Sequence, residues 1–390
     1  MKVIFSHDHI FYNYDGNLYS NGGLSYDVLS RYTKIFGEVT VLSRQKNITT
    51  KEQVEKLTKA SGQNVTFVKV PNFKSLKTFN KYPLAKKKIY REVKTSDIVI
   101  ARLPSSISKL VIEAAIKFKK PYLIELVGCA WDANMNHGSR VGKLIAYYEY
   151  RQLKNIISEA PYVVYITKNF LQSRYPNSFK SAICPNVKIS RVDHLILEKR
   201  LQKIEESKEG SVRLGLIGSL DVKYKGHETV IKALNEIKDR DIIVEFLGKG
   251  DNSYWKEMAE ELGVSHKIFF KGTLSGGEAV YQWIDSLDIM IQPSTAEAQG
   301  RSIIEGMSRG CPLIATRVGG IVELIDDSCL IDKKDYVGLS RIISSLIDDK
   351  ERMKKVAIEN FKASEEYYDY LIEEKRNSFF EEFKREALNA

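Results

Sequence analysis

The sequence predicts an α/β protein made of two Rossmann-like domains, each with a doubly wound parallel sheet. Three observations support this prediction. The chain has 390 residues, which is more than one ordinary hydrophobic core holds and favours two domains. Short β-rich runs alternate with amphipathic helical stretches, as in βαβ units. The alternation is interrupted by a highly charged stretch at 197–210 and then resumes.

The first domain is expected to span residues 1–190. Its strands are expected where short apolar runs lack polar alternation, as in parallel strands buried on both faces. Amphipathic helices are expected between them, for example at 24–36 and 106–118. The predicted strands are 3–5, 39–42, 64–68, 97–100, 121–126 and 162–166.

The charged residues 191–211 are expected to form a linker to a second domain at 212–360. A second βαβ series begins there, with a helix expected at 229–238 and strands at 212–218, 242–248, 268–272, 289–293 and 312–316. Residues 361–390 carry aromatic side chains at near-helical spacing. We expect them to form a C-terminal helix that packs back on the protein, with the first domain as one candidate surface.

Composition points to a soluble globular protein, with 43% hydrophobic and 28% charged residues. The N-terminus becomes polar too early for a signal peptide. No apolar run approaches the roughly 18 residues of a membrane span. The cysteines, Cys129, Cys184, Cys311 and Cys329, show neither zinc nor redox spacing. A cytoplasmic location is therefore expected.

The net charge of +10 is concentrated in residues 69–94, where lysines and one arginine alternate with aromatic and aliphatic side chains. Such a segment is attracted to an anionic membrane surface, here the inner face of the plasma membrane, or to another polyanion. A solvent-exposed helix face is the alternative. Nucleic acid is not expected as a partner, because no recognition motif accompanies the charge.

Two glutamates, Glu297 and Glu305, have seven residues between them, where a strand is expected to pass through a short loop into a helix. This spacing puts one carboxylate in the loop and the other in the early turns of the helix. The N–H groups of the helix's first turn face the same space. Carboxylates suit sugar hydroxyls and a helix N-terminus suits phosphate, so the segment predicts a nucleotide-sugar site. The alternative is a pair of carboxylates that only interact with the helix dipole.

The second domain also begins like a phosphate-binding unit. The strand 212–218 ends at Gly218-Ser219, and Lys225-Gly226 precede the next helix. Glycine lets a ligand approach the backbone, and lysine supplies a point charge for a diphosphate. A second glycine loop at Gly248 follows the next strand. Each loop alone is equally consistent with an ordinary strand-to-helix turn.

Taken together, these motifs resemble the donor domain of retaining glycosyltransferases of family 4. The resemblance covers most of residues 212–330 and runs in order through Gly218, Lys225-Gly226, Gly248, Phe269-Phe-Lys-Gly272, Pro293-Ser294, Glu297-x7-Glu305-Gly-Met, Gly310-x-Pro312 and Val318-Gly-Gly-Ile-Val-Glu323. It implies the two-domain GT-B fold, with an interdomain cleft.

The resemblance also implies roles for single residues. Glu297 would contact the hydroxyls of the donor sugar, and Glu305 would bind the ribose. Lys225 would neutralise the leaving diphosphate, helped by the N–H groups of Gly300, Arg301 and Ser302. In the first domain, Asn21-Gly22-Gly23 is similar to a glycine pair that the family places beside the donor phosphates. Base selectivity is expected to depend on the backbone near 271–273, which includes Gly272.

The chain departs from the family pattern at two places. Ser219 stands where the family usually has an arginine, so Lys223 or Arg301 is expected to supply the missing charge. The histidine that many members carry after the strand 121–126 is absent. Trp131 and Asp132 are its candidate substitutes, with a core tryptophan beside a capping aspartate as the alternative. His7-Asp8-His9 is interpreted as a polar acceptor-binding loop, because alternating side chains in an extended segment do not converge on a metal.

The resemblance implies a retaining, metal-independent hexosyltransferase that needs no cofactor besides its nucleotide-sugar donor. UDP-sugar is favoured over GDP-sugar by family frequency. The expected acceptor is a glycan, lipid-linked as in capsule or O-antigen assembly. The alternatives are a soluble transferase acting on a small phosphorylated acceptor, and a nucleotide-sugar-binding scaffold without activity, which Ser219 and the missing histidine keep open.

Overall fold

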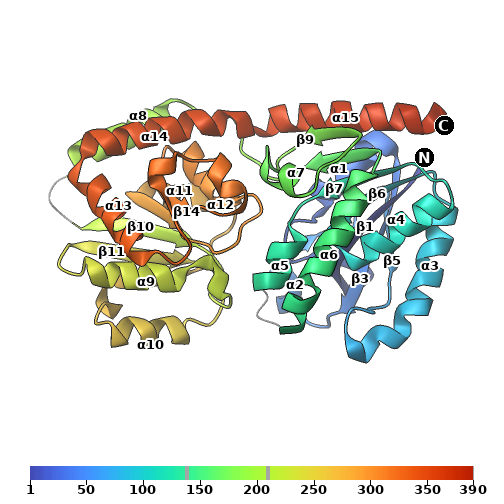
Figure 1. The fold of residues 1–390 in the computed structure, drawn as a ribbon, viewed down its shortest axis with the longest axis horizontal. Helices are drawn as coiled ribbons and strands as arrows, with labels where there is room; N and C mark the ends of the chain where they lie inside the picture. The colour runs from blue at the N-terminus through green and yellow to red at the C-terminus, as the bar shows by residue number, and fades with distance from the viewer. Residues whose placement is uncertain (137–139, 208–210, 390) are drawn as a thin grey trace.

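The computed structural model describes residues 1–136, 140–207 and 211–389. The described chain forms two sheets, one of nine strands and one of six, and each sheet is flanked by helices (Figure 1). The two-domain α/β prediction is therefore confirmed. None of the helices in the described ranges is both long and apolar enough to cross a membrane.

The first sheet has parallel strands in the order β5, β3, β1, β6, β7, β8, β9, and an antiparallel ribbon of β2 and β4 continues from the end of β1. From β1 the chain adds strands on one side of the sheet, and from β6 it adds them on the other, so the switch point of the sheet lies between β1 and β6. Ligands of such sheets bind at the switch point, outside the carboxyl ends of the strands. The strands are β1 (Lys2–Tyr14), β2 (Asn17–Ser20), β3 (Glu38–Asn47), β4 (Thr58–Lys59), β5 (Val65–Lys69), β6 (Ile98–Leu103), β7 (Tyr122–Leu126), β8 (Tyr162–Tyr165) and β9 (Lys180–Ile183).

Helices cover both faces of this sheet, and their apolar sides form the core between helix and strand. In β6 all six side chains are buried, as expected for a central parallel strand. The helices are α1 (Tyr26–Phe36), α2 (Lys51–Glu55), α3 (Tyr82–Lys94), α4 (Ser106–Lys117), α5 (Ala130–Asn136), α6 (Arg140–Ser158) and α7 (Phe170–Arg174), and the 3₁₀ helix η1 (Leu76–Lys81) precedes α3.

The second sheet is entirely parallel, in the order β12, β11, β10, β13, β14, β15. Its switch point lies between β10 and β13. The strands are β10 (Val212–Ile217), β11 (Ile242–Leu247), β12 (Ile268–Gly272), β13 (Ile289–Gln292), β14 (Leu313–Thr316) and β15 (Leu330–Ile331), and the main helices are α9 (His227–Glu236), α10 (Ser253–Glu261), α11 (Glu278–Ser286), α12 (Arg301–Ser308) and α13 (Tyr336–Asp348).

The segment expected as a linker contains a helix, α8 (Leu195–Glu206), which packs beside α14 (Lys350–Ser364). Arg200 of α8 is buried and donates hydrogen bonds to the backbone oxygens of Ile284 and Leu287. Part of the predicted linker, residues 208–210, lies outside the described residues.

The last helix, α15 (Asp369–Asn389), returns to the first domain and runs along it (Figure 1). Phe380 is buried against Tyr32 and Phe36 of α1, with ring centroids 5.9 and 5.7 Å away. Arg31 pairs with Glu373 at 3.1 Å. The C-terminal helices therefore hold both domains, α14 the second and α15 the first.

Candidate functional site

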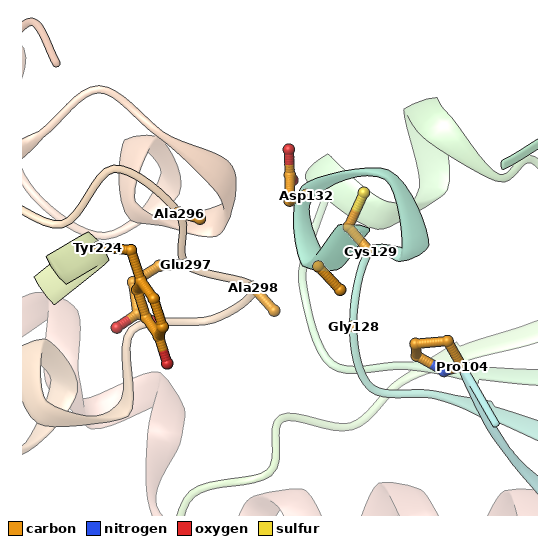
Figure 2. Close-up of a pocket in the computed structure, with 9 residues that line it drawn as sticks. Pro104, Gly128, Cys129, Asp132, Tyr224, Ala296, Glu297 and Ala298 are labelled. Atoms are coloured by element: carbon orange, nitrogen blue, oxygen red, sulfur yellow. The ribbon is translucent and has the colours of Figure 1, made fainter. Parts of the chain in front are cut away.

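The candidate site is a cleft in which loops at the carboxyl ends of the two sheets face each other. Two adjoining cavities of about 350 and 270 Å³ occupy it, and both are lined by Glu297 and Ala298. In the larger cavity Tyr224 and Glu297 face Asp132 and Cys129 across the opening (Figure 2). The cleft therefore lies at the meeting point of both switch points, where ligands of open α/β sheets bind.

Lys225 and Glu297 form an ion pair on the second-domain wall, with side chains 19% and 17% exposed. Lys225 ends a 3₁₀ turn after β10, and Glu297 lies in the loop after β13. The N–H of Thr295 donates to the carbonyl oxygen of Tyr224 at 2.8 Å, which fixes one loop on the other. The two residues predicted as catalytic are thus brought into direct contact.

Close backbone approaches explain two glycines around this pair. Gly226 has φ +88°, and a Cβ there would lie 2.2 Å from the carbonyl oxygen of Pro293. Gly319 has φ +56°, and a Cβ would lie 1.6 Å from the carbonyl oxygen of Glu297. Only glycine fits both the left-handed backbone and the space. The loop between β13 and α12 that carries Glu297, called the glutamate loop below, is therefore packed directly against the backbone of Gly226 on one side and of Gly319 on the other.

The other predicted glycines of the second domain meet behind Lys225. The N–H of Gly218 donates to Leu247 O at 2.9 Å, and the N–H of Gly248 donates to Gly272 O at 2.7 Å. A Cβ on Gly218 would lie 2.9 Å from the Lys225 stem. Ser219 donates from its hydroxyl to Lys249 O at 3.3 Å. The backbone of these residues thus lies directly beneath the side chain of Lys225, with Gly218 in closest contact.

Helix α12 begins at the cleft with Gly300 as its N-cap, at φ +82°. Gly300 and Arg301 line the smaller cavity, and the hydroxyl of Ser302 donates to Gln292 at 3.1 Å. The first N–H groups of a helix lack intrahelical acceptors and favour an anion. One turn further, burial raises the pKa of the Glu305 carboxyl, and nearby Arg301 opposes this shift.

The first-domain wall of the smaller cavity is formed by Gly23 and by side chains from β1 and β6, among them His7, His9 and Arg102. Gly22 precedes Gly23, and its N–H donates to the Ser20 hydroxyl at 3.2 Å. The expected glycine pair therefore lies at the cleft, before α1.

The expectation that His7-Asp8-His9 forms a loop is wrong, because these residues lie inside β1. The strand continues to Tyr14 through its pairing with β2 and β3, with a register shift against β3 between Ser6 and Ile10. His7 and His9 face the cavity, whereas Asp8 accepts from the N–H groups of Ser106 and Ile107 at 2.9 and 3.1 Å. The side chains diverge, and no group of three metal-ligating side chains is found in the part of the chain that the structure describes.

Of the residues predicted to replace the missing histidine and arginine, Asp132 and Arg301 line the cavities of the cleft, whereas Trp131 and Lys223 pack against aromatic rings. Trp131 packs edge-to-face on Tyr150, with centroids 6.1 Å apart, against the core of the first domain. Asp132 lines the larger cavity and pairs with Arg174 at 3.0 Å. Lys223 lies over the ring of Tyr254 at 4.2 Å, whereas Arg301 lines the smaller cavity.

Two cleft residues, Arg102 and Gln299, are not among those predicted from the sequence. The backbone N–H of Asn186 donates to Oε1 of Gln299 at 3.1 Å, which joins the end of the first domain to the glutamate loop. Arg102 lies within an otherwise apolar strand, and a charged residue in such a strand is the signal that points to it.

Comparisons with known proteins agree with this architecture. The family model for glycosyl transferases group 1 matches residues 198–363. Protein CapJ of Staphylococcus aureus is 32% identical over 371 residues, which cover 93% of this chain and 90% of CapJ. D-inositol 3-phosphate glycosyltransferase of Corynebacterium glutamicum is 32% identical over 154 residues, covering 35% of this chain and 36% of that protein.

Solved structures show the same fold at low sequence identity. HepE of Anabaena in complex with UDP and glucose has a TM-score of 0.65 at 16% identity, with both chains covered completely. Sucrose-phosphate synthase of Thermosynechococcus elongatus has a TM-score of 0.70 at 14% identity, with 99% of each chain covered. The two facing Rossmann-like domains are thus those of a GT-B protein. By its full-length similarity and its second-domain motifs, the chain belongs to the family of glycosyl transferases group 1.

Proposed function

We propose that the protein transfers a hexose-type sugar from a UDP-sugar to a glycan acceptor with retention of the anomeric configuration. The observation that carries this proposal is the Lys225–Glu297 ion pair near the N-terminus of α12, inside the interdomain cleft. One member suits a diphosphate, and the other suits sugar hydroxyls. When a donor binds, its diphosphate takes the place of Glu297 beside Lys225, and a sugar hydroxyl takes the place of Lys225 beside Glu297.

Retention follows if the acceptor attacks from the face that the diphosphate leaves. The diphosphate oxygen then takes the acceptor's proton, so the protein need only stabilise developing negative charge. Lys225 and the α12 N-terminus supply that stabilisation. A carboxylate base is not required, because the leaving diphosphate accepts the proton, and Glu297 is engaged with the donor sugar. The reaction is proposed to need no metal.

Calorimetric titration with UDP and with GDP tests the donor. UDP is expected to bind, and Lys225→Ala is expected to weaken binding by roughly tenfold or more, since a charge-assisted contact contributes about 1.5–3 kcal/mol. Lys238→Ala, an exposed lysine of the same domain, is the matched control. Tight binding of GDP alone would correct the base, and binding of neither would contradict the proposal.

A lipid-linked acceptor is proposed from the surface around the cleft. Helices of a Rossmann-like domain start at the edge where the parallel strands end, and Asp8 shows this for α4. Near the starts of α3 and α6 apolar side chains are exposed, including Phe79, Leu84 and Leu144, the last at 82%. Exposed lysines of the 69–94 segment accompany them. Such a rim suits an anionic bilayer.

Three cationic residues of the basic segment are already paired: Lys74 with Asp8, Lys86 with Glu113 and Arg91 with Glu92. Lys77, Lys81 and Lys87 are exposed and are the better test. Changing these three to Glu is expected to abolish flotation with phosphatidylglycerol vesicles. The same change at Lys238, Lys355 and Lys362 of the second domain is the control. Unchanged flotation would favour a small soluble acceptor.

A further inference from the structure

Arg102 is a buried arginine for which the described residues supply no hydrogen-bond acceptor and no ion-pair partner. Its side chain, on β6, is 6% exposed and lines the smaller cavity of the cleft. Within the described residues it makes no hydrogen bond and no ion pair. Glu125, its neighbour in register on β7, lines a further small cavity with Arg102, but the described residues show no ion pair between the two, and the carboxylate of Glu125 accepts from the Tyr32 hydroxyl at 2.8 and 2.9 Å. A buried charge is costly unless it is paired, so this position needs a functional explanation.

Gln299, which lines the same cavity, carries a second donor that has no acceptor among the described residues. Its side chain is 6% exposed, and its Oε1 accepts from the Asn186 N–H at 3.1 Å. That bond fixes the orientation of the amide. The Nε2 donor is buried and has no hydrogen-bond partner among the described residues. Leaving such a donor unsatisfied is also unfavourable. Two independent donors from opposite domains thus lack acceptors in one cavity.

The surroundings favour a negative ligand. Nδ1 of His7 accepts from the His9 N–H at 3.1 Å, and a neutral ring therefore carries its proton on Nε2, as a third donor. Arg301 lies on the opposite wall. The cleft carboxylate, Glu297, is already paired with Lys225. The cavity lining among the described residues includes Arg102 and Gln299 together with Gly300 and Arg301 at the start of α12, but not Lys225. A ligand held by Arg102 and Gln299 would therefore lie next to the proposed diphosphate site, and the effect of each variant on UDP affinity distinguishes the two.

We propose that Arg102 and Gln299 bind a sugar-borne carboxylate, so that the protein handles an acidic sugar of the uronic acid type. The inference rests on the proposed glycosyl transfer. A guanidinium presents parallel N–H groups that match the two oxygens of a carboxylate, and the Gln299 amide binds from the second domain. The carboxylate belongs either to the transferred sugar or to the acceptor's terminal sugar.

Calorimetry with matched sugars tests this proposal and separates the two sources. UDP-glucuronate and UDP-galacturonate are compared with UDP-glucose and UDP-galactose. Free glucuronate and galacturonate are compared with glucose and galactose on UDP-loaded protein. A preference for the acidic donors of about tenfold to a hundredfold is expected if the donor carries the carboxylate. A preference confined to the free acids assigns it to the acceptor.

Arg102→Met is expected to abolish the preference while UDP binding stays within about twofold of the wild type. Gln299→Glu is expected to abolish the preference as well, measured as the ratio of acidic to neutral donor affinity, because its new carboxylate lies beside the start of α12 and also weakens UDP binding. Arg191→Met, an exposed arginine, is the matched control and keeps the preference. Gln299→Glu keeps size and adds a repelling charge, so it serves if Arg102→Met fails to fold.

Two results would overturn the assignment: no acidic preference in any pair, or a loss of UDP affinity in Arg102→Met as large as in Lys225→Ala. A wild type that binds no UDP would instead remove the proposed function, and this inference with it.

Discussion

Lys225 and Glu297 each neutralise the other, so a change at one alters the other's availability. Removing Glu297 leaves the lysine without this partner, whereas removing Lys225 leaves a partly buried carboxylate without its cation, next to the proposed diphosphate site. The two residues therefore affect donor binding in opposite directions. This asymmetry separates a catalytic pair from an ordinary structural ion pair.

Glu297→Gln is expected to lower kcat by about a hundredfold or more, because a charged contact to the sugar hydroxyls is lost as charge develops. UDP affinity is expected to stay equal or increase, since Lys225 gains freedom. Steady-state kinetics and calorimetry measure the two effects. Glu305→Gln is the comparison, with weaker UDP binding expected from a lost ribose contact. Weaker UDP binding in Glu297→Gln would contradict the assignment.

His227, at the start of α9, is completely buried between Phe246 and Trp255. Both ring nitrogens lack hydrogen-bond partners in the described part of the chain. Burial, and then the charge of Lys225, lower the pKa of His227 from 6.5 to about 4. The unfolded chain binds this proton at higher pH than the folded chain. The free energy of unfolding therefore falls as pH drops from about 6.5 towards 4.

His227→Phe removes this proton and is expected to reduce the loss of second-domain stability between pH 8 and pH 5 by about 2 kcal/mol. In a Trp131→Phe background, the fluorescence of Trp255 and Trp283 during urea unfolding follows the second domain. His194→Phe, an exposed histidine, is expected to leave the loss unchanged. An equal loss in His227→Phe and wild type would show that the ring does not control it.

Sequence patterns identified the paired glutamates and the lysine, because their spacing follows from a local strand, loop and helix. Arg102 and Gln299 could not be found in the same way. What distinguishes them is a donor on a buried side chain that has no acceptor in the described part of the chain, which depends on how β6 and the loop after β13 come together in space. At the residue scale, the position of these residues in a local strand, loop and helix was predictable, and contacts between domains were not.

Among the elements, the central strands were predicted and the additional ones were missed. In the predicted strand 97–100, residues 98–100 are apolar and buried, which is typical of a central parallel strand. β2, β4 and β9 are short and partly exposed, so they lack that signal. Helix α8 was read as a linker because of its charge, but its amphipathic side packs beside α14 with Arg200 buried. Long charged side chains thus concealed a buried helix face.

Glu323 joins elements of different domains. From the 3₁₀ turn after β14, its carboxylate accepts from the N–H groups of Lys168 and Asn169 at 2.7 and 3.0 Å, and from that of Phe170. These donors lie at the start of α7, where backbone N–H groups have no intrahelical acceptor. One side chain of the second domain thus caps a helix of the first.

Glu323→Gln is expected to weaken this cap by about 1.5–3 kcal/mol, because an amide oxygen replaces two charged acceptors. Faster hydrogen exchange at the amides of Lys168, Asn169 and Phe170 is the measurement. Glu366→Gln is the control, since its pair with Lys168 is exposed and contributes little. Unchanged exchange in Glu323→Gln would show that the domains are held together elsewhere.

For the molecule as a whole, the chain crosses twice between domains. It leaves the first domain through α8 and returns through α15, so the first domain contains residues from both ends of the sequence. The aromatic spacing of 361–390 predicts one packed helix, with the first domain as a candidate surface, whereas the structure has the end of α14, a 3₁₀ turn and α15 there. An apolar stripe alone does not identify the helix against which it packs. The partner is α1, through Tyr32 and Phe36.

Phe380→Ala tests whether α15 is structurally part of the first domain. Truncating a fully buried phenylalanine costs about 3–5 kcal/mol through lost burial and a cavity. The loss is expected in the first domain, although the residue follows the second in sequence. Trp131 fluorescence follows unfolding of the first domain, and the fluorescence of Trp255 and Trp283 follows unfolding of the second. Urea unfolding of variants that keep only one of these sets shows which domain loses stability. Leu388→Ala, at an exposed position of the same helix, is expected to change neither transition. A shift confined to the second-domain tryptophans would mean that α15 stabilises the domain it follows, and that its contact with α1 contributes little.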